Sequence, residues 1–116
     1  MLRETLMSKK VKISFVIPEN LQKDLKERIV LDGYNLKEKS QWVVEAIERL
    51  LTINNYIDLV KVNDQMQGFQ KFESILIDRK LKIQLDESII AIRKKYLEID
   101  GVQSRIMRTA ILQRLL

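Results

Sequence analysis

The sequence predicts a mainly α-helical protein with one two-stranded antiparallel ribbon, made of two strand–helix–helix units fused in one chain. Two observations support this fold class. In each unit, a segment of alternating apolar residues precedes two segments with apolar residues at helical spacing. A weak internal repeat also relates the two units, which we place at 10–52 and 79–116.

The internal repeat consists of two matched segments in the same order. Lys12–Leu21 aligns with Lys80–Ile89 at an offset of 68, and Ser40–Ile47 aligns with Ser104–Ile111 at an offset of 64. The difference falls in the loops between the helices, where changes of length are easily tolerated. We therefore expect both units to share one topology.

Each unit begins with the period-2 pattern of a half-buried strand. One strand cannot form a sheet, so we expect the two strands to pair antiparallel, as an intramolecular pseudo-dimer, and to cover a four-helix core. Strand exchange between two chains stays open as an alternative. The residues expected on the outward face of the ribbon are Lys12, Ser14 and Val16 from one strand, and Lys80, Lys82 and Gln84 from the other.

Two helices are expected to follow each strand. The first helices should run from about Glu19 to Leu31, after Pro18, and from about Asp86, as N-cap, to Glu98. Left-handed glycines should end them, and serine N-caps should start the second helices. These residues are Gly33 and Gly101, and Ser40 and Ser104. The apolar faces expected for the second helices are Trp42, Val43, Ala46, Ile47 and Leu50, and Ile106, Met107, Ala110, Ile111 and Leu115.

Two further segments lie outside the repeat. We expect 1–9 to be a flexible arm. The connecting segment 53–78 is expected to be partly helical, because its apolar residues recur near helical spacing. They are Tyr56, Leu59, Val60, Met66, Phe69, Phe72 and Leu76.

Composition narrows the possible functions. The chain has no Cys and no His, which removes thiol chemistry, imidazole catalysis and Cys/His zinc sites. Its net charge of +5 favours nucleic acid or an anionic membrane surface as partner. No apolar run is long enough to span a membrane, and no secretory signal is evident. We therefore expect a non-enzymatic cytoplasmic protein without cofactor, metal, membrane partner or small-molecule ligand.

The outward face of the expected ribbon fits the major groove of double-stranded DNA. Lysine can reach guanine acceptors, glutamine can bracket adenine, serine adapts to either, and Val16 could touch a thymine methyl group. A solvated face of an amphipathic strand is the plainer interpretation. Two basic strands before matched helix pairs favour base reading.

Phosphate contacts are expected at the start of each second helix, where unpaired backbone N–H groups and the helix dipole attract anions. The same serines can also act only as N-caps. The candidate phosphate-binding residues are Lys37, Lys39, Ser40, Gln41 and Trp42 in one unit, and Ser104, Arg105, Ile106 and Arg108 in the other.

This order of elements, with the Val43-Val44-Glu45-Ala46-Ile47 core of the second helix, resembles the ribbon-helix-helix family, which includes the Arc and methionine repressors. The resemblance covers about 10–51 and 79–116. It implies that alternate strand residues read bases and that second-helix N-termini clamp phosphates. Val16 departs from the family's usual polar base readers.

Two units in one chain are similar to the tandem subgroup of that family, which includes relaxosome accessory proteins of conjugative plasmids, proteins of T-DNA border processing and some archaeal-virus regulators. The resemblance implies a relaxosome accessory factor or a transcriptional repressor. Its expected partners are DNA, further copies of the chain on adjacent sites, and a relaxase. An antitoxin-like protein-interaction module that uses 53–77 stays open as the alternative.

Overall fold

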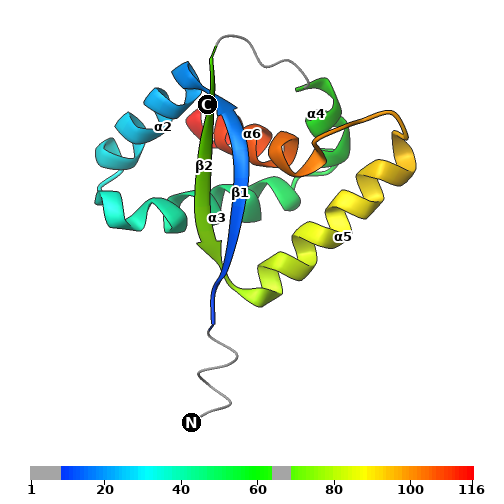
Figure 1. Cartoon of the computed structure of the whole chain (residues 1–116), viewed down its shortest axis with the longest axis horizontal. Coiled ribbons are helices and arrows are strands. Elements are labelled where there is room, and N and C mark those ends of the chain that lie inside the picture. Colours follow the sequence, from blue (N-terminus) through cyan, green and yellow to red (C-terminus); the bar gives the residue numbers. More distant parts are fainter. Residues whose placement is uncertain (1–8, 64–68) are drawn as a thin grey trace.

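The computed structural model describes residues 9–63 and 69–116, so all of the expected N-terminal arm except Lys9 lies outside the described residues. The described residues are mainly helical with one two-stranded antiparallel sheet, as predicted (Figure 1). The elements, in chain order, are β1 (Val11–Pro18), α2 (Glu19–Leu31), a 3-10 turn (Leu36–Glu38), α3 (Lys39–Leu51), α4 (Tyr56–Val62), β2 (Gln70–Ile77), α5 (Arg79–Lys95) and α6 (Val102–Leu115).

The two strands pair along their whole length. Val11 lies opposite Ile77, Pro18 lies opposite Gln70, and Ser14 faces Ser74 at the centre. Alternate side chains of a strand point to opposite faces, and one face of this ribbon is buried against the helices. Its buried residues are Ile13, Phe15 and Ile17 from β1, and Glu73, Ile75 and Ile77 from β2.

The first half of the chain follows the prediction closely. The helix α2 has the predicted bounds, Glu19–Leu31, and the φ angle of Gly33 is +87° at its end. The N–H of Tyr34 then donates to the carbonyl of Ile29 at 3.0 Å, which closes the turn. The helix α3 begins at Lys39, one residue before the predicted start, and buries all five residues predicted for its apolar face.

The predicted second strand is wrong. Lys80–Leu85 lies in helix α5, and the strand that pairs with β1 is Gln70–Ile77. Leu81 and Leu85 are both buried and lie four residues apart, which is the spacing of one face of a helix. The apolar residues of this segment also alternate as in a strand, so the sequence pattern is compatible with both structures. The carboxylate of Asp78 accepts a hydrogen bond from the N–H of Leu81 at 2.8 Å and caps this helix, the role predicted for Asp86.

The last two helices differ from the prediction at their ends. Helix α5 ends at Lys95, three residues before the predicted Glu98. Gly101 has a positive φ of 60°, as expected, but it lies directly before α6 and does not end α5. Helix α6 begins at Val102, so Ser104 lies inside its first turn and not at the N-cap.

Among the described residues of the connecting segment, the helical part is α4 (Tyr56–Val62). Met66 lies outside the described residues. The apolar residues that continue the predicted stripe belong to a different structure: Phe69 directly precedes β2, and Phe72 and Leu76 lie within it.

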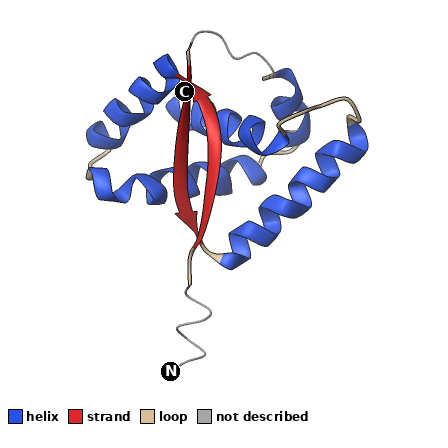
Figure 2. Ribbon diagram, in the orientation of Figure 1, coloured by secondary structure: helices blue, strands red, loops and turns tan. Residues whose placement is uncertain are grey.

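The core lies between the ribbon and the helices. Helices α3 and α6 pack against each other, α3 packs against β2 and α6 against β1. In Figure 2 the two strands cross in front of the helices, and no described helix covers their near face. The guanidinium of Arg114 ties α6 to α3, because it donates to the carbonyl of Trp42 at 2.6 Å and stacks 4.4 Å from the Trp42 ring. None of the described helices is long and apolar enough to cross a membrane.

Candidate nucleic-acid interface

The outer face of the ribbon is the candidate interface. Lys12 and Ser14 lie exposed on it, as predicted, and Val16 is half-buried. The residues opposite them on β2 complete this face, which we call the outer row. Its members are Lys12, Ser14 and Val16 from β1, and Phe72, Ser74 and Leu76 from β2.

The three residues predicted to supply the other half of this face lie elsewhere. Lys80 and Gln84 are exposed on α5, and the ammonium of Lys82 pairs with the Asp86 carboxylate one helical turn later, at 2.6 Å. None of them belongs to a strand, so the ribbon does not carry them.

Sequence reasoning missed Phe72, Ser74 and Leu76. Two of these outward residues are apolar, so the alternation that marks a half-buried strand is absent from β2. A signal was present further on, because Asp78 stands three residues before the buried Leu81, the spacing of a helix N-cap.

The N-termini of α3 and α6 lie at the two edges of the ribbon. The N–H of Val16 donates to Oγ of Ser104 at 3.1 Å, and the N–H of Leu76 donates to Oγ of Ser40 at 3.0 Å. Neither hydroxyl caps its own helix; each satisfies an edge N–H of the strand beside it. Both helix starts are therefore fixed next to the outer row.

Two more α6 side chains cover the edge of β1. The Gln103 side-chain amide donates to the carbonyl of Ser14 at 2.8 Å, and the Arg108 guanidinium donates to the carbonyl of Val16 at 3.1 Å. Arg108 is only 7% exposed. Burial, and then the neighbouring charge of Arg105, lower the pKa of Arg108. Its side chain holds the ribbon in place and does not present its charge to solvent, in contrast to the predicted phosphate contact.

The other predicted phosphate residues differ in what they expose. Lys37 and Gln41 are exposed, whereas the side chains of Trp42 and Ile106 are buried in the core, so only their backbone N–H groups remain as candidates. The Arg105 guanidinium donates to the carbonyls of Asp100 at 3.2 Å and Lys61 at 3.4 Å.

Lys39 faces inward to a buried carboxylate. Its ammonium lies 2.6 Å from Oε1 of Glu73, which is 8% exposed on the inner face of β2. The amide of Gln22 donates to the second oxygen of the same carboxylate at 2.5 Å. The ion pair joins the start of α3 to the ribbon and leaves Lys39 partly neutralised.

The exposed charges on the strands and on the residues that precede them have one sign. Across 9–18 and 69–77, each exposed charged side chain outside the helices is a lysine, namely Lys9, Lys10, Lys12 or Lys71. Glu73, the acid in the strands, is buried and paired. This distribution suits a polyanion.

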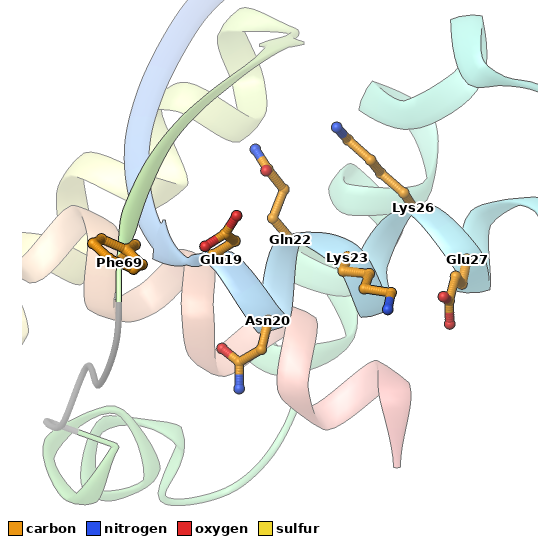
Figure 3. Close-up of a pocket in the computed structure, with 7 residues that line it drawn as sticks. All are labelled: Glu19, Asn20, Gln22, Lys23, Lys26, Glu27 and Phe69. Atoms are coloured by element: carbon orange, nitrogen blue, oxygen red, sulfur yellow. The ribbon is translucent and has the colours of Figure 1, made fainter.

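A surface hollow lies outside the outer row. It is an open groove of about 790 Å³ along the outer side of α2, between Phe69 and Glu27. Its lysines and acids point in separate directions (Figure 3), and no set of polar groups converges on one point. Within 9–63 and 69–116, no cluster of Asp or Glu side chains is placed to hold a metal ion.

Comparison with known proteins gives no further guide, because no protein-family model, curated protein or solved structure matches the chain.

Proposed function

We propose that the chain binds double-stranded DNA sequence-specifically by inserting its β1–β2 ribbon into the major groove. In this proposal one ribbon-helix-helix unit consists of β1, α2 and α3, the other consists of β2, α5 and α6, and the two form a pseudo-dimer within one chain. Its role is that of a transcriptional repressor or of a relaxosome accessory factor.

The observation that carries the proposal is the pair of helix N-termini at the edges of an exposed antiparallel ribbon. A two-stranded ribbon fits the width of the major groove. Ser40 and Ser104 hold the starts of α3 and α6 beside opposite strands. Backbone N–H groups at these starts would then face the phosphates that border the groove on each side.

Binding to DNA can be tested by selecting duplexes from a random pool and measuring affinity for the recovered sequence against salt concentration. If about four to eight phosphates are neutralised, log K should fall with log salt at a slope of about −4 to −7. A slope near zero, or recovery of no common sequence, would contradict the proposal.

A second candidate function is the binding of a protein partner by 53–77. The observation that favours it is the concentration of exposed large apolar side chains in this segment, which are Val62, Phe69, Phe72 and Leu76. Such side chains often mark interaction surfaces. Co-purification of a stoichiometric protein that protects this segment from proteolysis, with no DNA affinity, would support this function.

A further inference from the structure

The outer row is unusually apolar for a surface that reads DNA. Phe72 is 82% exposed and Leu76 is 50% exposed, and the half-buried Val16 lies opposite Phe72. The remaining members are one lysine and two serines. The row contains none of the arginine, asparagine or glutamine side chains that form bidentate contacts with bases.

Apolar side chains have one natural target in the major groove. The C5-methyl group of thymine is the apolar feature that a base pair presents there, and phenylalanine is among the side chains that contact it. Lys12 can donate hydrogen bonds to the acceptors of guanine, and the serines can form hydrogen bonds with any base.

The register places these groups at different ends of the ribbon. The cross-strand pair Val16 and Phe72 lies at one end, the two serines lie at the centre, and the pair Lys12 and Leu76 lies at the other end. The two end pairs lie four positions apart along each strand, which is about 13 Å, or roughly four base pairs of duplex.

We infer that the ribbon recognises thymine methyl groups, with Phe72 and Val16 reading one end of a short asymmetric site and Leu76 and Lys12 reading the other. The site is rich in A·T pairs and contains a guanine near the Lys12 end. This inference rests on the proposed function, and it names the class of DNA sequence that the ribbon selects.

Charge complementarity favours DNA over a protein or a second copy as the occupant of this face. The exposed charged side chains within the strands are Lys12 and Lys71, Lys9 and Lys10 precede β1, and two helix N-termini flank the ribbon. A second copy would bring the same lysines against these, and the like charges would repel.

The test uses the duplex recovered by selection and copies of it in which single thymines are replaced by deoxyuridine. Deoxyuridine keeps the hydrogen-bonding edge of thymine and lacks only the methyl group. For the native chain, replacement at a contacted position should weaken binding about fourfold, the effect of one buried methyl group.

The Phe72→Ala variant should lose this sensitivity at the positions that Phe72 reads, while its salt slope stays unchanged. Leu31→Ala is the matched control, because Leu31 is a similarly exposed apolar residue (79%) at the far end of α2. This variant should respond to deoxyuridine as the native chain does.

The outcomes separate the two proposals. Selective, salt-dependent binding that is indifferent to every deoxyuridine replacement would overturn methyl recognition and leave DNA binding standing. Absence of selective DNA binding, with a protein bound at Phe72 instead, would overturn both.

Discussion

The hydroxyl of Ser104 accepts a hydrogen bond from the N–H of Val16, 88 positions away in the chain, at 3.1 Å. Ser40 makes the corresponding bond to Leu76 at 3.0 Å. Serine thus links the start of each long inner helix to an edge of the ribbon. These two bonds fix the distance between the outer row and the helix N-termini, on which the proposed contacts with bases and phosphates both depend.

The two serine bonds should contribute unequally to stability. The Val16 bond is partly buried, whereas the Leu76 bond is exposed and water can replace it. Ser104→Ala should therefore lower the free energy of unfolding by about 1–2 kcal/mol, and Ser40→Ala by less than about 1 kcal/mol. Urea denaturation of both variants measures the difference. Equal losses, or a larger loss for Ser40→Ala, would contradict this ranking.

The ion pair between Lys39 and the buried Glu73 should depend on both partners. Lys39→Met leaves the Glu73 carboxylate buried with only the Gln22 amide as partner, and should cost about 2–3 kcal/mol of unfolding free energy. The double variant Lys39→Met with Glu73→Ile should recover most of this loss, because isoleucine matches the other inner residues of the ribbon. Denaturant unfolding of the single and double variants checks the prediction, which fails if the double variant is as unstable as the single one.

Glu45 should make stability depend on acidic pH. A hydrogen bond from Tyr34 is the main cause that lowers the pKa of Glu45 below its ordinary value of 4.5, and Gln41 and Arg114 act in the same direction. A carboxylate with a lowered pKa in the folded state stabilises the fold fully above pH of about 4.5, and this contribution is lost as pH falls through the folded-state pKa.

The measurement for Glu45 is the unfolding free energy of the native chain and of Glu45→Gln between pH 7 and pH 3. We expect a deficit of about 1 kcal/mol for the variant at pH 7 that shrinks toward zero in acid. Glu48→Gln, on the exposed side of the same helix, is the control and should show a much smaller deficit. A Glu45→Gln deficit that does not change with pH would count against this role.

Secondary structure could be predicted from the sequence where apolar residues lie on one face of an element and polar residues on the other. In β1, buried Ile13, Phe15 and Ile17 alternate with Lys12 and Ser14, and the strand was predicted correctly. The helices that follow β1 were also predicted, because their buried residues recur at helical spacing and Pro18 and Gly33 mark the bounds of α2.

The second strand could not be found in the same way. In β2 the outward residues Phe72 and Leu76 are as apolar as the inward Ile75 and Ile77, and the inward Glu73 is charged. The pattern therefore opposes the true alternation. The outer side of β2 is apolar, and this is why the strand could not be predicted from the sequence. The inferred recognition of thymine methyl groups depends on the same apolar side.

The offset of 68 predicted for the first segments of the internal repeat is also wrong. The first helices begin 60 positions apart, at Glu19 and Arg79, whereas the matched serines of the second helices are 64 positions apart. The extra residues belong to helix α5, which has 17 residues where α2 has 13. Apolar and polar residues alternate in Lys80–Leu85, and for this reason the sequence alignment matched part of helix α5 with β1.

The outer row of the ribbon is proposed to select the DNA sequence, and a competition experiment can test this selection. The native chain should prefer its selected duplex over a scrambled duplex by about 10³-fold or more at physiological salt. Replacing Lys12, Phe72 and Ser74 together by alanine should reduce this preference at least about 100-fold, since each base contact contributes about 1–3 kcal/mol of discrimination. Replacing Lys80, Lys82 and Gln84 on α5 should leave the preference unchanged. A folded outer-row variant that keeps the full preference would show that the outer row does not select the sequence.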